Sequence, residues 1–226
     1  MNLVALVSGG KDSALALYRV LGKSHNVRYL VTMIPQRDDS WMFHYPNIEL
    51  TDLFAEAVGI PLVKRETSGI RDEELVDLKS LLATLDVEGV VSGAVFSEYQ
   101  KSRIDGICKE LSLESLAPIW HEDPVRLIEE LIELGFRVII TGVYAYGFDQ
   151  KWLGREIDRG ALTDLVKLNR KWQVSVVGEG GEYETLVLDA PYFRKKIHIL
   201  RARNMWKEDS GYLLVEEAVL EEKNRS

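Results

Sequence analysis

Two glycine-rich segments contain the residues of this sequence that could do chemistry. The first, SGGKDS at residues 8–13, combines two glycines and a lysine with two hydroxyl side chains. Consecutive glycines let the backbone turn its N–H groups toward a ligand, and the start of a helix favours anions. The alternative is an ordinary turn in which Asp12 or Ser13 caps the helix. We favour phosphate binding, because the whole segment lies between a predicted strand and a predicted helix.

The second segment, GEGGEYET at residues 178–185, places three carboxylates among glycines. Glutamate can hold Mg²⁺, orient an amine or act as a base. In an extended chain Glu182 and Glu184 point to one face and Tyr183 to the other. A polar hairpin turn with solvated acids is the alternative interpretation.

The elements that must position these segments alternate along the first half of the chain. Periodicity predicts strands at 3–7, 27–34, 61–66, 89–95 and 114–117, and helices at 12–21, 47–58, 72–85 and 99–111. Strands separated by helices of this length predict a parallel sheet with helices on both faces. Ligands of such sheets bind beyond the carboxyl ends of the strands, which is where SGGKDS lies.

In the second half of the chain, predicted strands and helices alternate less regularly. Helices are predicted at 124–134 and 162–172, and strands at 138–143, 174–177, 196–203 and 212–217. We place a soft boundary at residues 118–123, which separates an α/β domain over 1–120 from a smaller α+β domain over 121–226. The charged end after Glu216 is expected to fray.

Composition narrows the function classes. The 226 residues include 36 acidic and 28 basic side chains, a net charge of −8, which disfavours tight non-specific binding to nucleic acid. Cys108 is the single cysteine and is expected in a helical core, so a disulfide within the chain or a cysteine-based zinc site is excluded. The four histidines are scattered without metal-ligand spacing. No apolar stretch reaches the ~20 residues that span a bilayer, so we expect a cytoplasmic protein.

The first segment resembles a known phosphate-binding loop. Neither the Walker pattern nor the dinucleotide pattern G-x-G-x-x-G is present. SGGKDS is instead similar to the SGGxDS loop of the PP-loop ATP pyrophosphatases, in the adenine-nucleotide α-hydrolase superfamily. Enzymes of this class cleave ATP between its α- and β-phosphates.

A narrower resemblance comes from the second segment. EGGEYET, followed by LVLDAP up to Pro191, resembles the signature of the diphthine–ammonia ligase family of PP-loop enzymes. Weaker matches extend the likeness over most of the chain: 42–44 with 46–47, 92–94, Tyr99-Gln100 with Arg103, 118–120 and 163–165.

This resemblance implies a fold and a reaction. The fold is a HUP-type Rossmann-like sheet that binds ATP over residues 1–120, with a substrate-recognition domain over 121–226 that carries GEGGEYET. The reaction activates the diphthine carboxylate of translation elongation factor 2 as an acyl-adenylate and releases pyrophosphate. Ammonia then displaces AMP to form diphthamide, and AMP leaves far more readily than hydroxide would. A homo-oligomer is left open.

The resemblance also implies the site residues. ATP is expected to contact Ser8, Gly9, Gly10, Lys11, Asp12, Ser13, Thr32, Met33, His44, Ser92, Gly93, Ala94 and Arg103. Catalysis is expected from Lys11 and from a glutamate that positions ammonia or deprotonates ammonium, with Glu179, Glu182 and Glu184 as candidates. The substrate is expected to contact Tyr99, Gln100, Gly180, Gly181, Tyr183 and Thr185. Asp12 either binds Mg²⁺ or only caps the helix, and His44 contacts a ligand or is an ordinary surface histidine.

Two other functions remain alternatives. A PP-loop enzyme that modifies tRNA is disfavoured by the acidic balance and by the lone cysteine. A non-catalytic adenine-nucleotide-binding module is disfavoured by the two motifs together. The basic residues at 194–196, Arg201 and Arg203 are explained as surface strand ends, with a contact to protein substrate or RNA as the alternative.

Overall fold

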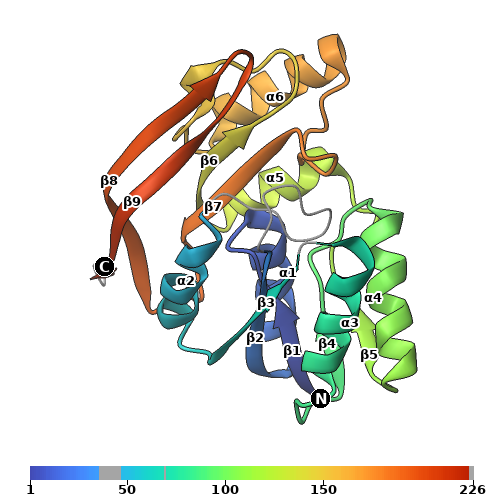
Figure 1. The fold of residues 1–226 in the computed structure, drawn as a ribbon. Coiled ribbons are helices and arrows are strands. Elements are labelled where there is room, and N and C mark those ends of the chain that lie inside the picture. Colours follow the sequence, from blue (N-terminus) through green and yellow to red (C-terminus); the bar gives the residue numbers. More distant parts are fainter. Residues whose placement is uncertain (36–46, 69, 224–226) are drawn as a thin grey trace.

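The first half of the chain forms an α/β layer, which the computed structural model shows within the residues it describes, 1–35, 47–68 and 70–223. Its strands are β1 (Asn2–Leu6), β2 (Asn26–Pro35), β3 (Leu62–Thr67), β4 (Gly89–Val91) and β5 (Glu114–Leu116). Its α-helices are α1 (Lys11–Leu21), α2 (Thr51–Val58), α3 (Arg71–Leu82) and α4 (Glu98–Glu110), and a 3₁₀ turn at Ile48–Leu50 precedes α2 (Figure 1).

The five strands form one parallel sheet in the order β3-β2-β1-β4-β5. Apolar side chains of α3 and α4 pack on one face, where Cys108 is buried as expected. Side chains of α1 and α2 belong to the cluster on the other face. The predicted Rossmann-like sheet with helices on both faces is therefore confirmed. The order of the strands reverses between β1 and β4, the point at which such sheets bind ligands.

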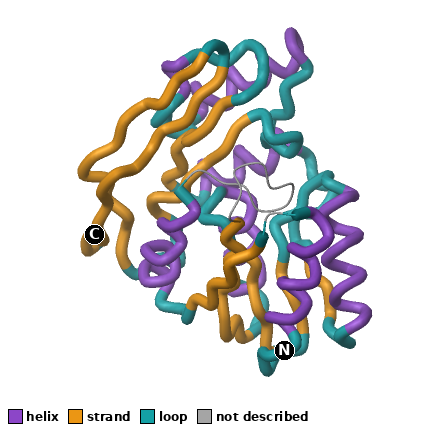
Figure 2. Tube along the Cα trace, in the orientation of Figure 1, coloured by secondary structure: helices purple, strands orange, loops and turns teal. Residues whose placement is uncertain are grey.

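The second half is a separate antiparallel sheet with two α-helices. Its elements are α5 (Pro124–Glu133), β6 (Arg137–Val143), a 3₁₀ turn at Gln150–Trp152, α6 (Arg159–Trp172), β7 (Tyr183–Asp189), β8 (Lys195–Lys207) and β9 (Ser210–Glu222). The strands run in the order β7-β6-β9-β8 (Figure 2).

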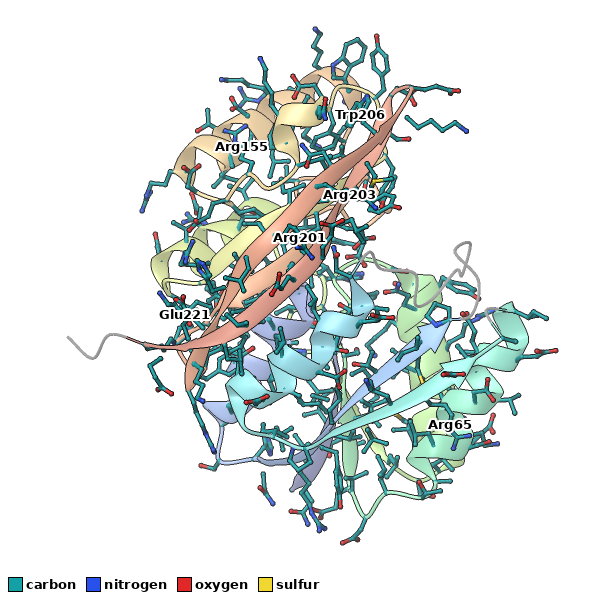
Figure 3. The ribbon with its side chains drawn as sticks, turned by 60° about the vertical axis from the view of Figure 1, so that its left-hand side comes forward. Arg65, Arg155, Arg201, Arg203, Trp206 and Glu221 are labelled. Carbon is teal, nitrogen blue, oxygen red and sulfur yellow. The ribbon has the colours of Figure 1, made fainter. Side chains whose placement is uncertain are left out.

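Two predictions for this half were wrong. Residues 174–177 form turns rather than a strand. The charged end does not fray over residues 217–222, because β9 pairs with β8 as far as Glu222. β8 carries basic side chains and β9 acidic ones. Ion pairs such as Arg201–Glu216 and Lys196–Glu221 therefore cross the hairpin (Figure 3).

One hydrophobic cluster joins the two halves. It contains β1 and α1 side chains together with those of β6 and β7, for example Leu15, Ile140 and Leu186. Tyr192, which follows β7, donates a hydrogen bond from its hydroxyl to the Ala14 carbonyl of α1 at 3.0 Å. In the described part of the chain, no helix is both long enough and apolar enough to cross a membrane.

Candidate active site

A cavity of about 800 Å³ opens beyond the carboxyl ends of β1 and β4 and is closed on its other side by residues 178–185. Both glycine-rich segments therefore line one space. Most residues predicted for the site lie on its wall: Ser8, Gly10, Lys11, Asp12, Ser13, Met33, Ser92, Gly93, Ala94, Tyr99, Gln100, Glu179, Gly180, Gly181, Tyr183, Glu184 and Thr185.

Strand β7 supports the first glycine-rich loop through hydrogen bonds. Gly9 has φ +82°, a conformation that favours glycine, and its carbonyl accepts a hydrogen bond from Val187 N at 2.9 Å. Lys11 N donates to Thr185 Oγ1 at 3.1 Å. Gly9 thus lies behind the cavity wall, and Thr185, predicted as a substrate contact, also supports the loop.

The start of α1 is open toward the cavity. Gly10 is the N-cap residue and provides no side-chain cap, which leaves a helix N-terminus suited to an anion. Ser13 Oγ donates to Gly10 O at 3.1 Å, and Ser8 Oγ accepts from Gly10 N at 3.3 Å. The two serines therefore shape the loop and also lie on the cavity wall.

The loop after β4 approaches α1 so closely that it requires glycine. A Cβ on Gly93 would lie 2.6 Å from Ser13 N and 2.8 Å from Ser13 Cα. The predicted strand over 89–95 ends at Val91, which leaves Ser92, Gly93 and Ala94 free to line the cavity. Ser92 is buried, and its hydroxyl finds no hydrogen-bond partner in the described part of the chain.

Lys11 is buried at the junction of the two halves. Its Nζ donates to Asp12 Oδ2 at 2.8 Å and to the Val177 carbonyl, and it lies 5.2 Å from the Tyr183 ring centroid. Burial lowers the pKa of Lys11, but the Asp12 carboxylate and Tyr183 outweigh it and hold the pKa above its usual value. Lys11 is therefore a permanent cation in the cavity wall.

Two of the three candidate glutamates hold the second loop in place. Glu179 Oε1 accepts hydrogen bonds from the N–H groups of Val95, Phe96 and Ser97 just before α4, at 3.3, 3.0 and 2.7 Å. Glu182 Oε1 accepts from Ser175 N at 3.0 Å and its Oε2 from Gly180 N at 2.8 Å, and Glu182 lies off the cavity wall.

Glu184 has a different environment. It lies on the cavity wall, and the described residues offer its carboxylate no hydrogen bond or ion pair. Burial raises the pKa of Glu184 to about 8, with a smaller lowering from Lys11 and a further raising from Asp12. A carboxyl group that titrates near neutral pH is suited to accept a proton.

Several predicted contacts lie away from the cavity wall or outside the described residues. Thr32 is buried in the sheet and donates from Oγ1 to the Val7 carbonyl at 2.8 Å. Arg103 stacks over the Tyr99 ring, with its guanidinium carbon 4.0 Å from the centroid, and is not on the wall. His44 lies outside the described residues.

Tyr144 is one of the wall residues that were not predicted. Tyr144, which directly follows β6, lies on the cavity wall, and its backbone N donates to the Glu182 carbonyl at 2.9 Å. Burial, and after it the charges of Glu184 and Tyr212, raises the pKa of Tyr144 above its usual value. No motif marks Tyr144, because its place depends on how β6 pairs with β7 and β9.

Among the residues that the structure describes, the cavity has no protein-built metal cage. The described residues contain no group of three histidine, cysteine, aspartate or glutamate side chains that could hold a metal ion. Asp12 fits a different arrangement, because Mg²⁺ often binds through one or two carboxylates together with substrate phosphates. Burial raises the pKa of Asp12, and the Lys11 ammonium opposes this shift.

Comparisons with known proteins cover both halves of the chain. Family models described as diphthamide synthase N-terminal domain and diphthamide synthase C-terminal domain match residues 1–115 and 123–220. The chain is 36% identical over 220 residues to the bovine protein named diphthine–ammonia ligase, covering 87% of this chain and 82% of the bovine one. The zebrafish protein of the same name is 34% identical, covering 94% and 91%.

A solved structure gives a weaker likeness. The predicted subunit of tRNA methyltransferase from Methanocaldococcus jannaschii matches with a TM-score of 0.47 and 14% identity, covering 84% of this chain and 98% of that one. This likeness is too low to support a conclusion about function.

Proposed function

Because the chain belongs to the diphthamide synthase family, we propose that it is an ATP-dependent ligase that converts the diphthine of translation elongation factor 2 to diphthamide. The single observation that supports this most strongly is that both glycine-rich segments line one cavity. One segment is built for phosphate, and the other brings to the same space a carboxyl group that has no partner among the described residues. A reaction between an activated phosphoryl group and an acceptor needs both.

The first step of the proposed reaction joins the acceptor to AMP. The diphthine carboxylate attacks the α-phosphorus of ATP, and pyrophosphate leaves. The open N-terminus of α1, the Ser8 and Ser13 hydroxyls and the Lys11 ammonium stabilise the charge on the phosphates. Mg²⁺, held by Asp12 and the phosphates, supplies further charge neutralisation when bound.

The second step forms the amide. Ammonia bonds to the acyl carbon, AMP leaves with the electrons of the broken C–O bond, and a proton is lost from nitrogen. Among the three candidate glutamates we assign the proton acceptor to Glu184, because the other two carboxylates are occupied by backbone N–H groups. We place the reaction in the cytoplasm, where elongation factor 2 works.

Mass spectrometry tests this proposal directly. Elongation factor 2 that carries diphthine is incubated with this protein, ATP and ammonium chloride. The expected product has the small mass decrease that replacing a hydroxyl with an amino group produces, and ATP yields AMP and pyrophosphate. Formation of ADP, or of no amide at all, would contradict the assignment. Omitting ammonium is the matched control.

A further inference from the structure

The ring of Tyr144 packs against strand β6 at a residue that has no side chain, Gly142. A Cβ on Gly142 would lie 2.6 Å from the Tyr144 hydroxyl oxygen, 2.9 Å from Cε2 and 3.0 Å from Cζ. The phenol ring therefore folds back onto β6 in the space that any side chain at position 142 would fill. Gly142 is thus required for the direction in which the Tyr144 ring points.

This direction brings the phenol close to Glu184. Gly142 pairs with Glu184 on β7 and with Tyr212 on β9, so the ring covers the strand between those two residues. Both Tyr144 and Glu184 line the cavity.

The Tyr144 hydroxyl is available to a ligand. Tyr144 is 40% exposed, and no hydrogen bond joins its hydroxyl to another described residue. Tyr183, the tyrosine of the second motif, differs, because its hydroxyl donates to the Val176 carbonyl at 2.6 Å and is buried. Of these two tyrosines, Tyr144 is therefore the one whose hydroxyl can donate a hydrogen bond to a ligand in the cavity.

We propose that the Tyr144 hydroxyl is a catalytic hydrogen-bond donor to the acyl carbonyl oxygen during amide formation, and that Gly142 sets its position. This inference rests on the proposed function. When ammonia bonds to the acyl carbon, the carbonyl oxygen gains negative charge until the C–O bond to AMP breaks and the carbonyl reforms. A donor already aimed at this oxygen lowers the barrier. Glu184 takes the proton from nitrogen on the same side of the cavity.

The protonation state of Tyr144 agrees with this role. Its neighbours on the packed strands are Glu184 and Tyr212, and the Lys11–Asp12 pair lines the same cavity. Burial and the Glu184 charge keep the pKa of Tyr144 above its usual value, so that the hydroxyl keeps its proton at neutral pH.

The test separates the two steps in the full-length protein. Adenylation is measured as ammonium-independent exchange of pyrophosphate into ATP, and amidation as single-turnover amide formation on diphthine-carrying elongation factor 2. Y144F is expected to slow amidation roughly 100-fold and to leave exchange near the wild-type rate. Y146F is the matched control, because Tyr146 lies on the same loop, is 68% exposed and packs against Trp172, away from the cavity wall.

A second variant keeps the hydroxyl but moves it. G142A is expected to displace the ring and slow amidation as much as Y144F, and the double variant should be no slower than either single one. Normal amidation by Y144F, or an equal loss of exchange and amidation, would overturn the inference while leaving the proposed function intact. A wild-type protein that forms neither AMP nor amide would instead remove the proposed function, and this inference with it.

Discussion

At the scale of single residues, Glu184 makes the stability of the protein depend on pH. Its pKa lies at about 8 in the folded chain, against an ordinary value of 4.5, so the folded state keeps a proton that the unfolded state releases. The free energy of unfolding that this proton contributes is full below pH 4.5 and is lost as pH rises through about 8.

We therefore expect E184Q to flatten this decline. Urea denaturation gives the free energy of unfolding at about pH 5 and about pH 9. Between these two pH values the free energy of unfolding should fall on the order of 2 kcal/mol more in the wild type than in the variant. Glu182, whose carboxylate has two backbone donors, provides the control E182Q. A pH dependence that E184Q leaves unchanged would show that Glu184 ionises freely in the folded protein.

Gly93 should be intolerant of even a methyl group. A Cβ there would lie 2.6 Å from Ser13 N, and the atom it meets is backbone, which cannot swing away. G93A is expected to cost roughly 1–3 kcal/mol of stability and to weaken ATP binding, because the first turn of α1 must shift.

G106A is the matched control for that variant. Gly106 lies in α4, and a Cβ there would meet nothing within 4 Å. Since alanine favours a helix interior, G106A should raise stability by about 0.5–1 kcal/mol and leave nucleotide affinity unchanged. Calorimetric titration with ATP and urea denaturation measure both quantities. Equal affinity for ATP in the two variants would contradict the importance of the Gly93 contact.

Many residues of the site could be predicted from the sequence. The environment of each side chain could not. SGGKDS and GEGGEYET identify about half of the cavity wall. The three glutamates are chemically identical in the sequence, however, and they differ only through backbone N–H groups from distant segments, such as those of Val95 to Ser97. Tyr144 was missed for the same reason, since its position depends on strand pairing.

At the scale of elements, Glu179 joins the second loop to the start of α4. Its carboxylate accepts from the N–H groups of Ser97, the N-cap residue of α4, and of Val95 and Phe96 just before it, and its charge suits that end of the helix dipole. E179A should therefore lower the free energy of unfolding by about 1–3 kcal/mol, and E179Q by less, because the amide oxygen still accepts.

Denaturation with urea measures this loss, and hydrogen exchange at residues 95–97 locates it. E133A is the control, because Glu133 is an exposed partner of Arg159 at 3.6 Å and should cost no more than about 0.5 kcal/mol. If E179A were as stable as E133A, Glu179 would be free for another role.

Most elements could be predicted because apolar residues repeat at helical or strand spacing. The run at 174–177 misled because its carbonyls bind side chains instead of a neighbouring strand. Val174 O accepts from Asn169, Val176 O from Tyr183 and Val177 O from Lys11. The full lengths of β8 and β9 were missed because their pairing involves exposed, charged positions that carry no apolar alternation.

At the scale of the whole molecule, Arg19 connects the two halves. Its guanidinium, on α1, binds the carboxylates of Glu122 and Glu130 and donates to the Pro118 carbonyl at 2.9 Å. Pro118 and Glu122 belong to the segment predicted as the boundary between domains, and that segment is thus tied to the α/β half.

We expect R19M to destabilise the protein by roughly 1–3 kcal/mol, since two carboxylates and a carbonyl lose their shared donor. R126M is the control, because Arg126 is highly exposed and, in the described part of the chain, its ion pair is with Glu129 three residues away in α5. Thermal and urea denaturation compare the two. An R19M protein as stable as R126M would mean that the hydrophobic cluster alone holds the halves together.

That shared cluster could not be predicted, because periodicity shows which residues are buried but not against which partner.

The support of the phosphate loop by β7 has a consequence for biosynthesis. Residues 1–120 leave the ribosome first, but Lys11 has its partners at Thr185 and Val177, and Gly9 has its partner at Val187. A nascent chain that stops before residue 187 therefore carries the loop sequence without the strand that shapes it. Unfinished chains should neither retain nor consume ATP, and nucleotide binding reports that translation has passed that point.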